Sequence, residues 1–333
     1  MNTGFRVAII GCGAISGNHI ESILAAGQTI CALCDIQEEK ARTAITKYAL
    51  NSVPVYTDYL SMLDTEKPDT VHICTPHYLH AEMAIAALER NIHVLCEKPV
   101  CISIPQLDAL HTAVRASKAQ LGICFQNRYE PNMQRLFEMT RTGVRGGCAH
   151  VVWKRDADYY HSADWRGTWK QEGGGVMINQ AIHTLDLLQW ICGTPTHVIA
   201  HTANDCLREV IEVEDTAYAR FQKADGSTFH FFATTSSQTD LPIQLEIRLA
   251  SGETVLASKK WLVSDKDLYS QQHSADPIGK TAWGSCHKAL IADFYNCLTA
   301  QCPFPIDLEQ GERAVRMILA MYRSNGESVS IFE

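Results

Sequence analysis

The chain has little positive charge and lacks long apolar runs. Among its 333 residues, 29 lysines and arginines stand against 37 acidic residues, for a net charge of -8. This balance offers no basic surface for phosphates, so we expect no nucleic-acid partner. The apolar runs have the length of strands, and residues 1–13 lack a charged-then-apolar leader. We therefore expect a cytoplasmic protein with no membrane partner.

The sequence also lacks a disulfide framework and a metal-binding motif. Its 13 cysteines are odd in number, and most lie inside apolar runs, where a thiol acts as a small hydrophobe. The one C-x-x-C, Cys31 to Cys34, falls on a predicted strand, where residues three apart point to opposite faces. No Cys/His cluster has zinc spacing, so we expect no metal. Free thiols suit the cytosol.

The first third of the chain alternates between strand-sized and helical patterns. Each strand-sized segment is followed by a turn signal or by a helix of ordinary length. The strands are expected within residues 5–11, 29–35, 52–66, 69–76, 92–99 and 120–127. This alternation predicts an α/β fold, an N-terminal Rossmann domain with a doubly wound parallel sheet and right-handed crossovers.

After Asn127 the pattern changes to longer strands of alternating polarity. An Asp-Gly hairpin turn at residues 223–227 joins two of them. The expected strands are residues 148–154, 196–202, 215–222, 227–236 and 243–250, and helices follow at 286–298 and 307–324. We predict a nucleotide-binding domain at residues 1–124 and a C-terminal α+β domain at 125–333, with a large, mostly antiparallel open sheet.

The turn after the first strand carries a glycine pattern. Gly11 and Gly13, followed by Ala14 and Ile15, can bring backbone amides close to a pyrophosphate at the start of a helix. Asp35 ends the second strand, where a carboxylate binds ribose hydroxyls and repels a 2'-phosphate. The pattern predicts a site for NAD, with NADP less favoured. The alternative is a glycine turn that connects the strand to the helix and binds no ligand.

Two further strand ends are expected at the same edge of the sheet, where ligands of this fold bind. Thr75 and Pro76 end one strand, with His80 just beyond, and Glu97 and Lys98 end the next. An ammonium group at this edge could face the nicotinamide and stabilise the alkoxide that develops in hydride transfer. We expect all five residues to line the cofactor site, with Lys98 catalytic and Glu97 its orienting or structural partner.

A glycine-rich segment and a helix carry the second set of candidates. Asn179 and His183 are four residues apart, so they share one helix face and can point into one cleft. His183 suits proton transfer near neutral pH, although a histidine packed at a domain interface is the alternative. Asp186 is expected to support the helix rather than to do chemistry.

The loop at residues 155–175, before this helix, is rich in aromatic residues and is expected to line the substrate site. Trp165 could stack on a sugar ring or only pack, and Arg166 could clamp a carboxylate or phosphate or form a salt bridge within the loop. Asn127 and Arg128 lie where the first domain passes to the second, and Arg128 has a structural alternative. Of the remaining histidines, His72 and His93 fall inside strand patterns, and most of the set are expected at the core edge or the surface.

These motifs resemble those of the glucose-fructose oxidoreductase / inositol dehydrogenase / MocA family. The motifs are "GCGAISGNH", "TPHYLH", "CEKPV" and "GGGVMINQAIHTLDLLQW", and the resemblance covers essentially the whole chain. It implies that Lys98 lies beside the nicotinamide and the substrate, and that the Lys98–Pro99 bond is cis. It also implies that residues 127–128 lie near the substrate and that the open sheet of the second domain forms a homodimer or homotetramer.

One position departs from the family pattern. Relatives resembling inositol dehydrogenase carry Asp and His where this chain has Asn179 and His183. An amide can bind a substrate hydroxyl but cannot accept its proton, so the general base is His183 alone or a relay of Lys98 and His183.

Together the motifs predict an NAD-dependent oxidoreductase. The expected reaction is hydride transfer between nicotinamide and a secondary hydroxyl, or the matching ketone, of a sugar, sugar derivative or cyclitol. Two alternatives stay open: a glycosidase or lyase of the same family that uses NAD transiently, and a non-catalytic NAD-binding protein.

Overall fold

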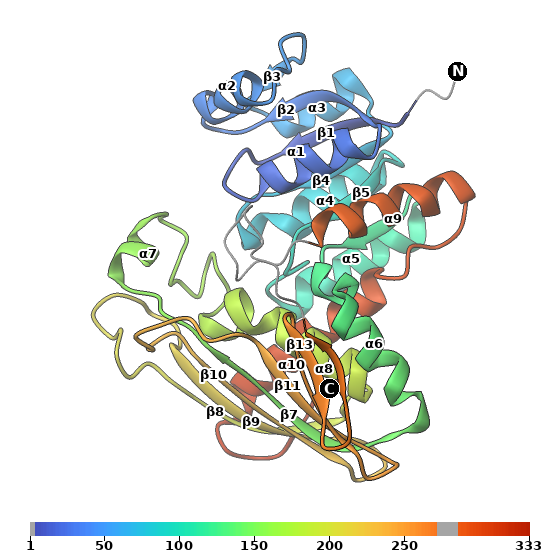
Figure 1. Ribbon diagram of the computed structural model, residues 1–333. Coiled ribbons are helices and arrows are strands. Elements are labelled where there is room, and N and C mark those ends of the chain that lie inside the picture. The colour runs from blue at the N-terminus through green and yellow to red at the C-terminus, as the bar shows by residue number, and fades with distance from the viewer. Residues whose placement is uncertain (1–3, 272–285) are drawn as a thin grey trace. The chain divides into compact units, whose positions relative to one another are not determined.

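The computed structural model describes residues 4–271 and 286–333, which belong to two compact units (Figure 1). Among the described residues, unit 1 comprises 4–126 and 286–312, and unit 2 comprises 127–271 and 313–333. This division differs from the single boundary expected after residue 124. The chain returns to unit 1 because helix α9 (His287–Ala300) packs against helix α1 (Ser16–Ala25).

Unit 1 is built around a six-stranded sheet in the order β3-β2-β1-β4-β5-β6. Every pairing in it is parallel, and the direction of winding reverses between β1 and β4. The strands are β1 (Arg6–Ile10), β2 (Thr29–Cys34), β3 (Val55–Tyr56), β4 (Thr70–Ile73), β5 (His93–Cys96) and β6 (Leu121–Ile123). The predicted Rossmann fold is confirmed.

The other helices of unit 1 are the crossovers between these strands. Two of them begin at side-chain caps that the sequence shows: Asp58 accepts from the amides of Leu60 and Ser61, and Ser103 accepts from Gln106. The helices are α2 (Glu38–Lys47), α3 (Tyr59–Glu66), α4 (His80–Glu89) and α5 (Ile104–Ala116), with a short helical turn η1 (His77–Leu79) before α4.

Unit 2 contains a nine-stranded sheet in the order β14-β13-β12-β11-β7-β10-β9-β8-β15. Its pairings are antiparallel except that of β7 with β10, so the expected mostly antiparallel sheet is confirmed. The strands are β7 (Val144–Val152), β8 (His197–Ala203), β9 (Thr216–Gln222), β10 (Thr228–Thr234), β11 (Gln244–Leu249), β12 (Thr254–Ser258), β13 (Trp261–Ser264), β14 (Leu268–Gln271) and β15 (Val329–Ser330).

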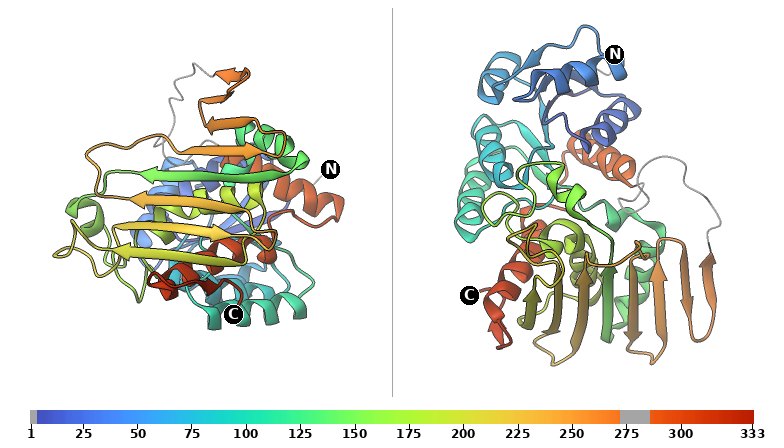
Figure 2. Two further views of the ribbon diagram at one scale, coloured as in Figure 1. Left: turned by 90° about the horizontal axis from the view of Figure 1, so that it is seen from below. Right: turned by 90° about the vertical axis from the view of Figure 1, so that its left-hand side faces the viewer.

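Helices cover one face of this sheet, and Figure 2 shows none on the other face among the described residues. Along β9, β10 and β11 buried and exposed residues alternate, and the exposed positions include Tyr218 and Phe232. Helix α8 packs on β7, and α6 packs on β12. The helices of this unit are α6 (Pro131–Met139), α7 (Ala157–His161), α8 (Ile182–Cys192) and the part of α10 (Leu308–Ser324) that follows Glu312.

Two composition-based expectations concern cysteines and membranes. All 13 cysteines are free thiols; Cys34 is buried and Cys31 half-buried, as expected for thiols on a core strand. Among the helices of residues 4–271 and 286–333, none is long and apolar enough to cross a membrane.

Candidate active site

The carboxyl ends of β1, β2, β4 and β5 carry the predicted cofactor residues to one edge of the unit 1 sheet. Gly11, directly after β1, has φ +90, and a Cβ there would lie 2.6 Å from the carbonyl oxygen of Cys74, which follows β4. Only glycine tolerates both conditions. By contrast, a Cβ on Gly13 would meet nothing within 4 Å. The turn is therefore closed towards the sheet and open on the other side.

The residues around this turn fit a dinucleotide. Ser16 donates to the carbonyl oxygen of Gly13 at 2.7 Å, and Ile15, at the start of α1, offers no side-chain cap to the first amides of the helix. Asp35 is fixed after β2, because its Oδ2 accepts from the Cys12 amide and its Oδ1 from the Gln37 amide, both at 2.8 Å. An open glycine turn at the start of a helix and a placed carboxylate match pyrophosphate and ribose.

At the end of β4 the three predicted residues have different surroundings. Thr75 and Pro76 are half-buried at the edge, and Thr75 Oγ1 lies 3.5 Å from the sulfur of Met83. His80 is buried, and its ring nitrogens lie 2.6 Å from the Pro99 carbonyl oxygen and 2.8 Å from that of Thr75. Both nitrogens are engaged with the backbone, so His80 ties the end of β4 to the turn after Lys98. Its predicted cofactor contact stays a prediction.

Glu97 is buried and holds the backbone of the next residue. Its Oε2 accepts from the Lys98 amide at 3.2 Å, while its Oε1 lies 3.1 Å from Nε2 of both His19 and His287. Burial alone would raise the pKa of Glu97, but the hydrogen bonds from His19 and His287 outweigh it and hold this pKa well below its usual range. The carboxylate is ionised, so both imidazoles donate to it.

A hydrogen-bonded chain extends from Glu97 into the core. Nδ1 of His19 lies 2.8 Å from Nδ1 of His72, and Nε2 of His72 lies 2.9 Å from the Tyr295 hydroxyl. Because His19 donates to Glu97 and burial lowers the pKa of both histidines, His72 donates to His19 and accepts from Tyr295. The chain is satisfied with neutral imidazoles.

Sequence reasoning missed this cluster. His72 is fully buried, so it is not one of the core-edge or surface histidines that make up most of the expected set. His19, Glu97 and His287 come from α1, the turn after β5, and α9, and no local motif links them. The only signal is the presence of histidines at apolar positions of a strand and two helices.

Lys98 is half-buried between buried Glu97 and buried Pro99 at the carboxyl edge of β5. The Lys98–Pro99 bond is cis, as the family resemblance implies. Lys98 thus lies at the same edge as Gly11, Asp35 and Thr75, on the strand two places from β1 in the sheet.

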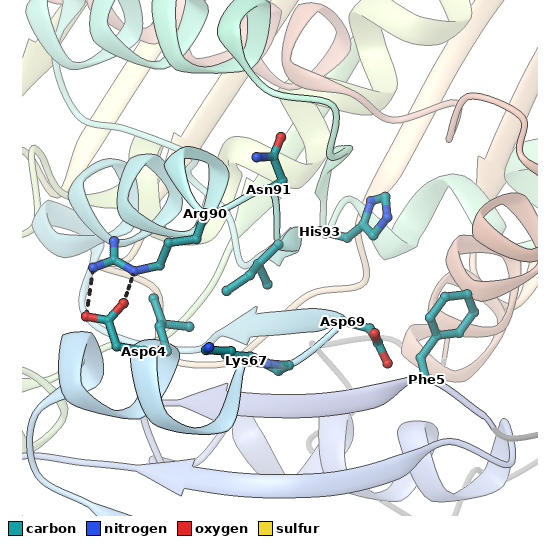
Figure 3. Close-up of a pocket in the computed structure, with 10 residues that line it drawn as sticks. Phe5, Asp64, Lys67, Asp69, Arg90, Asn91 and His93 are labelled. Atoms are coloured by element: carbon teal, nitrogen blue, oxygen red, sulfur yellow. Dashed lines mark hydrogen bonds and ion pairs between the residues drawn. The ribbon is translucent and has the colours of Figure 1, made fainter.

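A pocket also opens at the opposite, amino-terminal edge of this sheet (Figure 3). Phe5, Asp69 and His93 line it just before or at the first residues of β1, β4 and β5, and an ion pair of Arg90 with Asp64 closes one side. Ligands of doubly wound sheets bind at the carboxyl edge, so we do not assign this pocket to the cofactor.

In unit 2, Asn179 and His183 are more exposed to solvent than the residues around them in the sequence. Residues 176–189 are buried except for these two, which are half-buried. Asn179 lies in a π-helical turn, η4 (Met177–Ala181), and His183 lies in the first turn of α8. The two residues thus share the less buried side of the segment, as their spacing predicts. Isolated π turns recur at functional sites.

Asn179 belongs to a polar cluster with the loop before it. Its Nδ2 donates to Glu172 Oε1 and, at 3.2 Å, to the Tyr159 hydroxyl, which also accepts from Arg166. Glu172 is buried and accepts the amide of Gly167 with its other oxygen. Burial raises the pKa of Glu172 to about 7, against the hydrogen bonds from Gly167 and Asn179. Neither Tyr159 nor Glu172 was among the predicted site residues.

The glycine run before this helix packs closely on the backbone of Glu214, whose side chain is a second buried carboxylate. A Cβ on Gly175 would lie 1.9 Å from the Glu214 carbonyl oxygen. The Glu214 carboxylate accepts from the amides of Gly175 and Met177 and from the Tyr322 hydroxyl, each at 3.0 Å. The carboxylate therefore caps free backbone amides at the start of the helical segment. Burial raises the pKa of Glu214 to about 7, against these hydrogen bonds.

We predict that the raised pKa of Glu214 contributes a loss of stability as pH rises from about 4.5 to 7. Over this range the folded state binds a proton that the unfolded state has lost, so stability falls with pH. The shift from 4.5 to about 7 corresponds to roughly 3 kcal/mol. Urea unfolding of the parent and of Glu214→Gln at pH 5 and pH 8 measures this contribution as the difference between their two pH dependences. The prediction is contradicted if Glu214→Gln shows the same pH dependence as the parent. Glu209 is exposed, so Glu209→Gln is the control and should leave the pH dependence unchanged.

The remaining predicted substrate residues divide into two kinds. Arg128 is only 5% exposed, and its guanidinium binds both oxygens of Asp186 at 2.6 and 2.8 Å. This geometry favours the structural alternative for Arg128 and the supporting role expected of Asp186. Asn127 and Trp165 are half-buried, and the Arg166 guanidinium carbon lies 4.8 Å from the Trp165 ring centre. Trp165 thus packs on Arg166.

Comparisons with known proteins match both units. Residues 5–125 match a family model described as "Oxidoreductase family, NAD-binding Rossmann fold", and residues 133–254 match the "GFO/IDH/MocA C-terminal domain". D-glucoside 3-dehydrogenase of Escherichia coli is 31% identical over 194 residues, covering 57% of this chain and 54% of that protein. Myo-inositol 2-dehydrogenase of Thermotoga maritima is 25% identical over 189 residues, covering 56% of this chain and 55% of that protein. The matches thus span about half the length of these curated relatives.

A solved structure matches along the whole chain. The WlbA dehydrogenase from Bordetella pertussis, in complex with NADH and UDP-GlcNAcA, superposes with a TM-score of 0.87 at 26% identity. The match covers 99% of this chain and 98% of that one.

Proposed function

Because the chain belongs to the Gfo/Idh/MocA family of oxidoreductases, we propose that it is an NAD-dependent dehydrogenase of a sugar, sugar derivative or cyclitol. The observation that carries the proposal is the position of Lys98. It lies at the carboxyl edge of β5, on a backbone held by buried Glu97, at the edge that also carries the open glycine turn and Asp35. Lys98 is therefore positioned to act beside a bound dinucleotide.

The cofactor and the chain have separate tasks in this reaction. NAD supplies the hydride acceptor, and a secondary alcohol with NAD⁺ gives a ketone, NADH and one proton. The turn at Gly11 and Gly13, the first amides of α1, and Asp35 bind and orient the dinucleotide. The Lys98 ammonium donates a hydrogen bond to the reacting oxygen and stabilises the charge that develops on it.

The proton released from the hydroxyl needs an acceptor in the chain. Asn179 cannot take it, because an amide only hydrogen-bonds the substrate. The proposed acceptor is His183, on the same less buried side of the helical segment as Asn179. Glu172 and Tyr159 fix the Asn179 amide, so that it can orient a substrate hydroxyl.

The names of the relatives support this substrate class. The matched proteins act as dehydrogenases of a glucoside and of myo-inositol by name, and the matched structure contains NADH with a nucleotide sugar. None of these names favours the glycosidase or lyase alternative. A panel of neutral and acidic sugars, cyclitols and UDP-GlcNAcA, assayed for NADH absorbance with NAD⁺, tests the proposal. We expect NADH with at least one member, whereas cleavage of a sugar without net NADH would refute it.

Asp35 sets the choice between the two dinucleotides. We predict that Asp35→Ser weakens discrimination against NADP about 10-fold or more, because a carboxylate repels a 2'-phosphate and a hydroxyl does not. Kd values for NADH and NADPH, measured by nicotinamide fluorescence, check the change. If the unmodified protein already prefers NADPH, the role given to Asp35 is wrong. Asp64→Ser, which removes a carboxylate at the other edge of the sheet, is the control.

We also propose that unit 2 assembles the protein into a homodimer or homotetramer through the uncovered face of its sheet. Tyr218 of β9 and Phe232 of β10 are directly paired across the strands and are 54% and 40% exposed. Exposed aromatic residues side by side on a bare sheet are typical of an interface. Sedimentation velocity measures the assembly, and a monomer at micromolar concentration would contradict it.

A further inference from the structure

Arg166 differs from neighbouring arginines of unit 2 in lacking a carboxylate partner. Arg128 pairs with Asp186 at 2.6 Å, and Arg155 pairs with Asp240 at 3.2 Å. Among the residues that the structure describes, no carboxylate lies within ion-pair distance of the Arg166 guanidinium. Its Nε is buried without a hydrogen-bond partner in the same set of residues. A half-buried guanidinium with so few acceptors is costly unless a ligand supplies them.

Aromatic rings hold this guanidinium in place. Its central carbon lies 4.4 Å from the Tyr159 ring centre and 4.8 Å from that of Trp165, and one of its amino groups donates to the Tyr159 hydroxyl. The Tyr159 ring itself packs against a hydrophobic cluster of Tyr160, Ile211 and Val213. The planar donor group is therefore preorganised, a condition that favours specific binding of a planar anion.

The same cluster connects Arg166 to the candidate catalytic helix. The Tyr159 hydroxyl oxygen lies 3.2 Å from Nδ2 of Asn179 and 3.1 Å from the side-chain amide nitrogen of Gln180. A ligand bound to Arg166 would lie beside Asn179, on the segment that carries His183.

We propose that Arg166, held between Tyr159 and Trp165, binds a carboxylate of the substrate, so that the substrate is an acidic sugar or cyclitol. The inference rests on the proposed function for the role of the ligand as a substrate. A single guanidinium with buried Glu172 close by suits a monoanion better than a phosphate dianion. The two N–H groups of one guanidinium edge match the two oxygens of a carboxylate.

Calorimetric titration of the NAD-bound protein with D-glucuronate, D-glucose and glucose 6-phosphate tests the proposal. We expect D-glucuronate to bind about 10- to 100-fold more tightly than D-glucose, the range for hydrogen bonds to a charged group. Arg166→Met should abolish this preference, and Arg166→Lys should keep only part of it. Arg155→Met is the matched control, because Arg155 also lies over the Tyr159 ring but already has Asp240 as a partner. It should keep the full preference.

Each other outcome overturns the proposal. Equal binding of the acid and the neutral sugar, no binding of the acid, or a preference that survives in Arg166→Met removes the carboxylate subsite. Tighter binding of glucose 6-phosphate than of D-glucuronate would show that the subsite recognises a phosphate and not a carboxylate. Thermal unfolding and NAD binding of Arg166→Met, unchanged from the parent, exclude misfolding as the cause. The proposed function can fail separately. If D-glucuronate binds through Arg166 but no sugar yields NADH, the carboxylate subsite is supported and the proposed dehydrogenase activity is refuted.

Discussion

Lys98→Met lowers kcat/KM for sugar oxidation by about 10²- to 10⁴-fold, the range for loss of a charge-stabilising or proton-transferring group. Methionine keeps the length of the side chain and removes the ammonium, so the turn held by Glu97 is retained. NAD binding should not change, because the pyrophosphate and ribose contacts come from the glycine turn and Asp35. Steady-state kinetics and NADH fluorescence titration measure the two effects.

Lys118→Met is the control for this prediction. Lys118 is exposed and precedes β6, at the opposite edge of the same sheet, so its loss should leave both kinetics and binding unchanged. Near-normal turnover of Lys98→Met would show that Lys98 does not act on the reacting oxygen. A parallel loss of NAD binding would instead make Lys98 a cofactor-binding residue.

Asp186→Ala destabilises the protein by about 3–5 kcal/mol, because it removes the carboxylate that balances a buried guanidinium. Both side chains of the pair are almost completely buried, at 5% and 1% exposure. The double variant Arg128→Met/Asp186→Leu should lose less stability than Asp186→Ala, since it leaves no buried charge behind. Urea unfolding at pH 7 gives the three free energies.

An exposed ion pair supplies the comparison. Arg141 and Glu138 are 69% and 56% exposed, so Glu138→Ala should cost less than about 1 kcal/mol. If Asp186→Ala were as mild as Glu138→Ala, the Arg128–Asp186 pair would not stabilise unit 2. Arg128 would then be available again as a substrate residue.

The cofactor half of the site could be predicted from the sequence because its signals are local. Gly11, Gly13, Asp35 and Lys98 each lie one or a few residues beyond an apolar strand, and a parallel sheet brings these strand ends to one edge. The Asn179 and His183 pair follows from helical spacing in the same way. The structure altered the local geometry through a π turn but kept both residues on one side.

The rest depends on contacts between distant segments. His287 reaches Glu97 only because α9 returns to unit 1, and no pattern near either residue indicates this. Glu172 and Tyr159 surround Asn179 through an irregular loop, whose path periodicity does not describe. The strands β12 to β14 have only four or five residues each, too few for a periodic pattern to mark them in this part of the sequence.

The most direct test of the account is transfer of deuterium from substrate to cofactor. A sugar that yields NADH is prepared with deuterium on the carbon that is oxidised, and the reduced cofactor is analysed by mass spectrometry. We predict one deuterium on each nicotinamide formed and one ketone for each NADH, because the hydride moves directly between the two carbons. Reduced cofactor without deuterium, or a cleaved sugar with no reduced cofactor, would contradict a dehydrogenase.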